Sequence, residues 1–359
     1  MDSWPNLRPD LAALEGYHSP QVEVDVRLNT NESPYPPPAE WLERVARATL
    51  DIGFHRYPDR SATTLRDALA HHHGVSAGEI FCANGSNEVL QLLFLAFGGP
   101  GRSVGLFEPT YTLHAHIARL TGTNVVPAQR DGTFAIPEEA KAKVLERQPA
   151  LVFLCSPNNP TGAAESRQTV EGLLAATASW GGLVVVDEAY GQFAPWSAID
   201  LRREDVPGSE RLVVVRTFSK TWSMAGLRLG YLVADPRVVA AMDLVALPYH
   251  LDAWKQQAGT MALEYVDDMN QAVERIRSER QRVVEALGGL KVTQWPTDAN
   301  FVLFAPEGVS ADTVWEKLLL RSVLVRNCSS WPGLEGCLRV TIGRPDENDR
   351  FLEAMKEIL

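Results

Sequence analysis

The sequence is poor in cysteine and contains no long apolar run. Its 359 residues include only 4 cysteines, and none of them forms a CxxC pair, which excludes a disulfide scaffold and fits a reducing compartment. No apolar stretch reaches the roughly 20 residues that a membrane-spanning helix needs. The opening segment MDSWPNLRPD also lacks the apolar core of a signal peptide. We therefore expect a soluble, cytoplasmic protein.

Positive charge is also scarce. The 34 Lys and Arg residues are outnumbered by 45 Asp and Glu residues, which leaves a net charge of −11. This charge opposes binding to nucleic acid or to anionic lipid, so small-molecule partners are favoured. The hydrophobic content of 45% is ordinary for a globular protein. A chain of this length exceeds the size that one core serves well, so we expect two subdomains.

The order of sequence patterns predicts an arm followed by two domains. Residues 1–38 include SPYPPP, which cannot be helical and should lie extended as an arm. Over residues 39–248, helical patterns alternate with short β-rich runs, which predicts a mostly parallel sheet flanked by helices. Over residues 249–359, a long charged helical pattern precedes the short runs ANFVLF, SVLVRN and CLRVTIG, which predicts a smaller α+β domain.

Polar residues follow the predicted strands, at the edge where ligands collect in open α/β sheets. EIFCA is followed by Gly85, Ser86 and Asn87 and then by an apolar helical run. Such a helix N-terminus can hold a phosphate, although it can also be a simple cap. Tyr111 follows SVGLFE and could stack on a planar ligand or pack in the core. Asn159 lies in the turn after LVFLC, where turn-forming asparagines are common.

The next two strands end on acidic and basic groups. LVVV is followed by Asp187 and then Tyr190, and this carboxylate could cap a helix or lie against a cationic ring nitrogen. The run RLVVVRTFSK ends on Thr217, Ser219 and Lys220, with Arg228 eight residues later.

Lys220 stands in TFSKTWSMAGLRLGY, where its neighbours are small, aromatic or apolar. Such a lysine either extends outward to water or takes part in chemistry. Together with the groups above, it completes the set that pyridoxal phosphate requires: a lysine for the covalent link, a carboxylate for the pyridine nitrogen, and donors for the ring oxygen and the phosphate. Poor hydration and the nearby Arg228 should both lower the pKa of Lys220.

An ordered series of motifs makes the chain resemble a known family nearly from end to end. The motifs are VRLNTNESPYPPP, HRYPDRSATTLRDALA, ANGSNEVL, FEPTY, CSPNNPTG, VVDEAY, TFSKTWSMAGLRLGY, LPYHL, ANFVLF and GCLRVTIG. The series is similar to the aspartate-aminotransferase-like enzymes of fold type I and, within them, to the histidinol-phosphate aminotransferases. The resemblance implies pyridoxal 5′-phosphate as cofactor. It implies conversion of L-histidinol phosphate and 2-oxoglutarate to imidazole-acetol phosphate and glutamate, in histidine biosynthesis.

The resemblance also implies roles for individual residues. Lys220 would form the covalent link to the cofactor and later move a proton, and Asp187 would pair with the pyridine nitrogen. Tyr190 and Asn159 would bond the 3-oxygen of the ring, on which Tyr111 would stack. The rest of the implied cofactor-binding set comprises Gly85, Ser86, Asn87, Thr217, Ser219 and Arg228, with Tyr57 reaching the phosphate from a second subunit. A homodimer with shared active sites is therefore implied.

The resemblance also implies that a pair of arginines binds the phosphate of the substrate, where other aminotransferases bind a carboxylate. Arg326 in SVLVRN and Arg339 in CLRVTIG are thirteen residues apart, and paired guanidinium groups suit both phosphate and carboxylate. Arg326 could instead be a surface ion-pair residue. Tyr17 matches an arm tyrosine that reaches the substrate phosphate of the partner subunit.

Several alternatives stay open at this point. An aromatic amino acid aminotransferase and a threonine-phosphate decarboxylase would share the fold and the cofactor residues, and a non-catalytic cofactor-binding paralogue is a more remote reading. Asp252, Trp254 and Lys255 replace the small or hydroxylated residues that the family commonly has there, and they could change specificity if they line the pocket. The run 71–73 of histidines is expected at a solvated helix end and not at a metal, because adjacent helical residues cannot converge on one ion.

Overall fold

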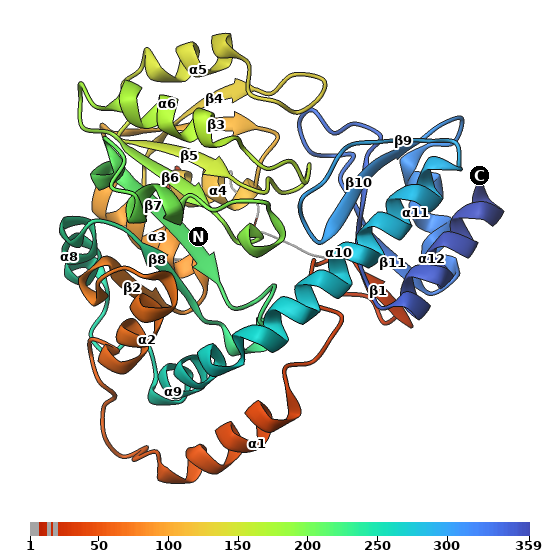
Figure 1. Ribbon diagram of the computed structural model, residues 1–359. Helices are drawn as coiled ribbons and strands as arrows, with labels where there is room; N and C mark the ends of the chain where they lie inside the picture. The colour runs from red at the N-terminus through yellow and green to blue at the C-terminus, as the bar shows by residue number, and fades with distance from the viewer. Residues whose placement is uncertain (1–6, 13–15, 17–20) are drawn as a thin grey trace, which may run out of the picture.

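The computed structural model describes residues 7–12, 16 and 21–359. In this part of the chain, the strands form a seven-stranded sheet of order β2-β8-β7-β6-β5-β3-β4 and a five-stranded sheet of order β1-β11-β12-β10-β9. Figure 1 shows the two sheets side by side, with helix α10 extending from α9 to the small sheet. The predicted α/β architecture, with a large sheet domain and a smaller one, is confirmed.

The large sheet is parallel at its centre. Its strands are β2 (Ile80–Ala83), β3 (Ser103–Glu108), β4 (Asn124–Gln129), β5 (Leu151–Cys155), β6 (Leu183–Asp187), β7 (Leu212–Thr217) and β8 (Gly230–Val233). Strands β3 to β7 pair in parallel, while β8 is antiparallel to both β2 and β7. The sequence did not predict β4, because its residues NVVPAQ are largely exposed and include a proline, as suits an edge strand.

Helices cover both faces of the large sheet, so its central strands are apolar at nearly every position. In β6, Val185 faces one core and Val184 and Val186 face the other. The first core is closed by α3 (Ser86–Phe97), α4 (Thr112–Leu120) and α8 (Pro236–Val245). The second is closed by α2 (Thr63–His73), α5 (Glu138–Leu145), α6 (Arg167–Thr177) and α9 (Ala253–Ala262).

The small sheet is mixed and carries the C-terminal helices. Its strands are β1 (Val26–Leu28), β9 (Val292–Gln294), β10 (Phe301–Pro306), β11 (Val323–Asn327) and β12 (Leu338–Thr341). Strand β1 comes from the predicted arm and pairs in parallel with β11, while the other pairs are antiparallel. The packing helices are α10 (Val266–Gly288), α11 (Ala311–Leu320) and α12 (Pro345–Ile358). The domain boundaries after residues 38 and 248 stay a prediction.

Shorter elements complete the chain. They are α1 (Ala39–Ala48), α7 (Ile199–Arg203) and the 3₁₀ turns η1 (Thr49–Asp51), η2 (Ala77–Glu79), η3 (Gly191–Phe193), η4 (Ser209–Arg211), η5 (Ala225–Leu227) and η6 (Leu263–Tyr265). In the described residues, no helix is both long enough and apolar enough to cross a bilayer. In the same residues, no three His, Cys, Asp or Glu side chains are grouped so that they could hold a metal ion.

The prediction of a solvated helix end at residues 71–73 is wrong for His73. Its Nε2 lies 2.7 Å from the hydroxyl oxygen of Tyr231 on strand β8. The surrounding protein removes water from this ring, and burial lowers the pKa of His73 to about 2. The imidazole is therefore neutral and belongs to the packing between α2 and the sheet.

Candidate active site

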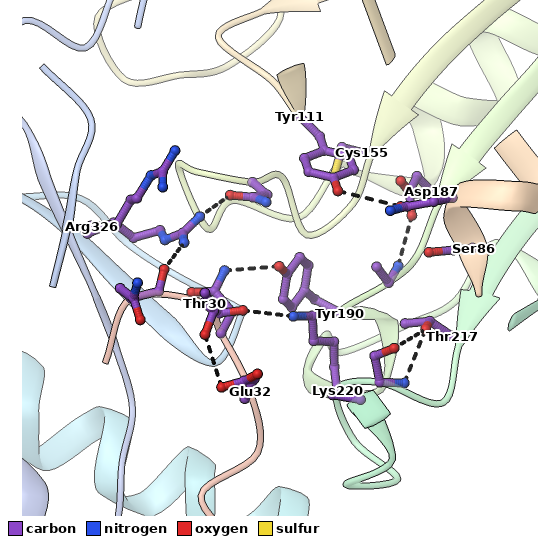
Figure 2. A pocket seen from close by; sticks show the side chains of 18 of the residues that line it. Thr30, Glu32, Ser86, Tyr111, Cys155, Asp187, Tyr190, Thr217, Lys220 and Arg326 are labelled. Carbon is purple, nitrogen blue, oxygen red and sulfur yellow. Dashed lines mark hydrogen bonds between the residues drawn. The ribbon is translucent and has the colours of Figure 1, made fainter. Parts of the chain in front are cut away.

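A cavity of about 380 Å³ lies where strands β5, β6 and β7 end, facing strands β11 and β12 of the small sheet. Because the carboxyl ends of parallel strands meet at one edge, side chains distant in sequence converge there. Figure 2 shows Lys220, Asp187, Tyr190 and Arg326 around this cavity. The predicted site residues that line it are Ser86, Asn87, Tyr111, Asn159, Asp187, Tyr190, Thr217, Ser219, Lys220, Arg228, Arg326 and Arg339.

Lys220 directs its amine into the cavity. Its Nζ donates to the carbonyl oxygen of Thr30 at 2.9 Å, so the arm segment helps to place the amine. Burial is the main reason that the pKa of Lys220 falls to about 8, and the guanidinium of Arg339 is the next cause. Arg228 lowers the pKa further, while Glu32 opposes the shift. A substantial share of this amine is therefore neutral and nucleophilic near neutral pH.

This shift predicts the pH dependence of covalent capture by the cofactor-free protein. Lowering the pKa to about 8 means that the neutral amine predominates above pH 8 and the ammonium below it. From pH 7 to pH 9 the neutral fraction rises roughly tenfold, whereas an ordinary lysine titrates near 10.4. The rate at which pyridoxal phosphate forms its absorbing adduct should rise with pH, with a midpoint near pH 8. The rate measured with the Lys220→Ala variant is subtracted to remove reaction at other amines. A midpoint at pH 10 or above would contradict the account.

Asp187 is held by a histidine that the sequence analysis did not single out. Asp187 ends β6 with its side chain 2% exposed, and Nε2 of His114 lies 3.0 Å from its Oδ2. The backbone N–H of Ala189 donates to Oδ1 at 3.1 Å. His114 is on α4, three residues after Tyr111, and that helical spacing is the signal that could have found it. These two hydrogen bonds therefore fix the orientation of the Asp187 carboxylate at the cavity.

Hydrogen bonds from Asn31 and Arg339 hold the two predicted partners of the ring oxygen. Nδ2 of Asn31 donates to the hydroxyl oxygen of Tyr190 at 2.9 Å. Oδ1 of Asn159 accepts from Nη1 of Arg339. Burial raises the pKa of Tyr190, so its phenol stays protonated and can donate. Both side chains line the cavity, so a bound ring oxygen could reach both.

The start of α3 forms the anion-binding end of the cavity. Ser86 is the first residue of the helix, where backbone N–H groups have no partner within the helix. Gly85 has a φ of +85°, a backbone conformation that favours glycine, and a Cβ there would displace the guanidinium of Arg228. Nη1 of Arg228 donates to Oγ of Ser219 at 3.1 Å, and the hydroxyl of Thr217 donates to the same oxygen at 3.0 Å.

The two predicted substrate arginines are direct neighbours. Arg326 on β11 pairs with Arg339 on β12 in the antiparallel register, which places both side chains on one face of the sheet. Arg339 is 5% exposed and donates through Nη2 to the carbonyl oxygen of Asn29 at 2.8 Å. The guanidinium carbon of Arg326 lies 5.3 Å from the ring centre of Trp331. Both arginines line the cavity. Their spacing of thirteen residues is the length of chain that connects these paired positions of β11 and β12.

Of the predicted site residues that the structure describes, Gly85 and Tyr57 do not line the cavity within one chain, although Gly85 directly precedes the lining residue Ser86. Tyr57 is 80% exposed and stacks on Tyr249 with ring centres 4.4 Å apart. The lining of the cavity does not include it, so its role across a subunit boundary stays a prediction. Tyr17 lies outside the described residues.

The unusual residues after the LPYHL motif do not line this cavity within the chain. Asp252 caps α9 by accepting from the backbone N–H of Lys255, and Trp254 donates to Oγ1 of Thr49 at 2.9 Å. Nζ of Lys255 donates to Oδ1 of Asn84 at 2.8 Å, directly before the glycine turn at the start of α3. Lys255 therefore supports the anion-binding turn, and within one chain none of the three side chains lines the cavity.

Several lining residues were given no role by the sequence analysis. The arm segment supplies Asn29, Thr30, Asn31 and Glu32, the β11–β12 loop supplies Trp331, and the large domain supplies Cys155, Ala189, Ala225 and Gly226. Burial raises the pKa of the Cys155 thiol well above its usual range, so this group is not a nucleophile. The motif VRLNTNESPYPPP contained the signal for the arm residues, but their contacts depend on the pairing of β1 with β11.

These groups fit pyridoxal phosphate. Hydroxyls, an arginine and a helix N-terminus suit its phosphate, and a buried carboxylate suits its ring nitrogen. Because Gly85 has no Cβ, the backbone of this turn can approach a phosphate closely. A single partly buried amine completes the set.

Comparisons with known proteins agree with this chemistry. Residues 23–355 match the family described as aminotransferase class I and II. The chain is 45% identical over 361 residues to the histidinol-phosphate aminotransferase of Thermobifida fusca, covering 97% of this chain and 94% of that protein. It is 43% identical over 372 residues to that of Frankia casuarinae, covering 98% and 90%.

Solved structures share the fold. The histidinol-phosphate aminotransferase of Sinorhizobium meliloti in complex with pyridoxal-5′-phosphate superposes with a TM-score of 0.86 at 23% identity, covering 99% of this chain and 98% of that chain. The L-threonine-O-3-phosphate decarboxylase of Porphyromonas gingivalis superposes with a TM-score of 0.80 at 24% identity, covering 92% and 98%. At these identities the similarity establishes the fold and does not separate the two activities.

Proposed function

The chain belongs to the class I and II aminotransferases and, within them, to the histidinol-phosphate aminotransferase family, and on this premise we propose how its residues carry out that reaction. The enzyme transfers the amino group of L-histidinol phosphate to 2-oxoglutarate, giving imidazole-acetol phosphate and L-glutamate in histidine biosynthesis. The observation that carries the proposal is the convergence of Lys220, Asp187 and the neighbouring arginines 326 and 339 on one cavity.

The cofactor, when bound, supplies an aromatic ring that accepts electrons from the substrate Cα. Lys220 would provide the covalent attachment, and its free amine would be placed to take the proton from the substrate Cα. Asp187, oriented by His114, would hold a proton at the ring nitrogen. Tyr190 and Asn159 are placed to bond the ring oxygen, and Tyr111 to stack on the ring.

The arginine pair accounts for the use of two different substrates. A phosphate and a carboxylate both accept the two parallel N–H bonds that a guanidinium offers. Arg339, held by hydrogen bonds, and Arg326, its neighbour across the strand pair, can receive the phosphate of histidinol phosphate in one half-reaction. The same pair can receive a carboxylate of 2-oxoglutarate in the other half-reaction.

We also propose a homodimer, which the surface around Tyr57 supports. Within one chain, large apolar side chains are exposed in this region: Leu50 is 87%, Phe54 72% and Leu247 77% exposed. Such a patch favours association, and a second subunit would bury it. Tyr57 would then reach the cofactor phosphate of the partner, and Tyr17 the substrate phosphate. We also propose a cytoplasmic location, in keeping with the proposed pathway and the free cysteines.

The choice of amino donor tests this function directly. Histidinol phosphate should be turned over with a higher kcat/KM than phenylalanine, because only the former brings a dianionic phosphate to the two arginines. A coupled assay that measures glutamate formation from each donor, with 2-oxoglutarate as acceptor, decides the matter. Faster turnover of phenylalanine would identify an aromatic amino acid aminotransferase instead. Release of carbon dioxide from threonine phosphate would identify a decarboxylase.

A further inference from the structure

Trp331 lines the active-site cavity, and the proposed reaction gives it no role. It lies in the segment 328–337, which connects β11 and β12. Backbone bonds close this segment on itself: the N–H of Cys328 donates to the carbonyl of Cys337 at 3.0 Å, and the N–H of Trp331 donates to the carbonyl of Cys328 at 2.9 Å. Trp331 therefore lines the cavity from a turn that backbone hydrogen bonds hold closed.

The indole packs between a small core and an arginine. On one side it contacts the cluster that contains Leu303, Cys328 and Leu334. The guanidinium carbon of Arg326 lies 5.3 Å from the ring centre. A ring engages the flat face of a guanidinium, whereas the five N–H donors of arginine lie in its plane. This contact can therefore fix the orientation of Arg326 and still direct donors toward an anion.

The two arginines of the pair are held in different ways. Arg339 is nearly buried and donates to the carbonyl oxygen of Asn29 and to Oδ1 of Asn159. Arg326 lies against an aromatic ring at the cavity wall, and this ring belongs to a loop and not to the sheet. A change at Trp331 should therefore act on Arg326 and leave Arg339 in place.

We propose that Trp331 is a positioning residue that holds Arg326 for a phosphate dianion and so favours phosphorylated donors over donors that carry only carboxylates. This inference rests on the proposed function. A dianionic phosphate has three acceptor oxygens and gains more from a second oriented guanidinium than a carboxylate does. The contribution of Trp331 is consequently larger for phosphorylated donors than for donors that carry only carboxylates.

Trp331→Leu tests this proposal, because leucine keeps apolar bulk and removes the ring face. The KM for histidinol phosphate and the inhibition constant for inorganic phosphate should both rise roughly fivefold to tenfold. Values of kcat and the KM for glutamate should stay within about twofold of the wild type. A merely structural role of Trp331 would not raise the constants for phosphate-bearing ligands alone. Trp331→Phe restores a ring face and should recover most of the loss.

Trp295→Ala is the matched control. Trp295 packs on the same small core beside Phe134, but it does not line the cavity. This variant should leave the ratio of the two donors unchanged. The proposal is overturned if Trp331→Leu impairs both donors equally, if it changes neither, or if Trp295→Ala reproduces its effect.

Failure of this inference and failure of the proposed function are distinguishable. A wild-type enzyme that does not turn over histidinol phosphate would refute the proposed function. In that case, the inhibition constant of inorganic phosphate against glutamate turnover still reports on Trp331. Conversely, normal turnover of histidinol phosphate with unchanged constants in Trp331→Leu refutes only the role of Trp331.

Discussion

Lys220→Ala abolishes transamination and leaves the cofactor bound only non-covalently. The variant loses both the attachment point and the group that moves the proton at Cα, and general acid–base catalysis alone contributes up to roughly 10⁴-fold. Cofactor affinity should fall less than activity, because the phosphate site at the start of α3 and the contact to Asp187 remain. Absorption spectra with added pyridoxal phosphate, together with glutamate formation, measure both effects.

Lys141→Ala is the control for removing a lysine. Nζ of Lys141 pairs with Glu138 on α5, and neither residue lines the cavity. Its removal should leave activity and the absorption spectrum unchanged. Retained turnover in Lys220→Ala would remove Lys220 from the mechanism, and with it the reason for an apolar lysine in TFSKTWSMAGLRLGY.

Asp187→Asn should lower kcat roughly 10²- to 10³-fold, or about 2.7–4 kcal/mol in the barrier. The amide keeps the size of the side chain but no longer stabilises a proton on the ring nitrogen, so the bound ring becomes a weaker electron acceptor. Cofactor affinity should also fall. Single-turnover rates with histidinol phosphate at saturating pyridoxal phosphate separate these two effects.

His114→Phe tests how much the orientation of Asp187 contributes, because it keeps the charge of that carboxylate and removes its hydrogen bond to His114. Phenylalanine preserves the packing against Phe153, whose ring centre lies 4.9 Å from that of His114, and removes the hydrogen bond to Asp187. We expect a loss of roughly tenfold, in line with one hydrogen bond to a charged group. A loss as large as that of Asp187→Asn would show that the histidine does more than orient. Full activity of Asp187→Asn would contradict the assignment of the ring-nitrogen partner.

The sequence predicted the residues whose position is set by the end of a strand. Asp187, Thr217 and Lys220 follow buried runs of valine, and parallel strands bring such ends together without any knowledge of side-chain packing. Arg326 and Arg339 were found by resemblance, and the antiparallel register explains why they lie side by side. The glycine turn before α3 was predicted for the same local reasons.

The rest depended on contacts between distant segments. Thr30 contacts Lys220, and Asn31 contacts Tyr190, across sequence separations of 190 and 159 residues, because β1 joins the small sheet. No periodicity in the arm predicts that pairing. Lys255 was considered as a pocket residue, but its bond to Asn84 places it behind the anion-binding turn. Such outcomes are decided by tertiary packing and not by local pattern.

Reduction of the cofactor-loaded protein with borohydride, followed by peptide mass mapping, tests the central assignment most directly. The account predicts one pyridoxyl group, attached to Nζ of Lys220 in the peptide that contains residues 217–231. The amine with its pKa lowered to about 8 is the nucleophile that the cavity presents to the aldehyde. An adduct on another lysine, or an unmodified Lys220 in loaded protein, would contradict it.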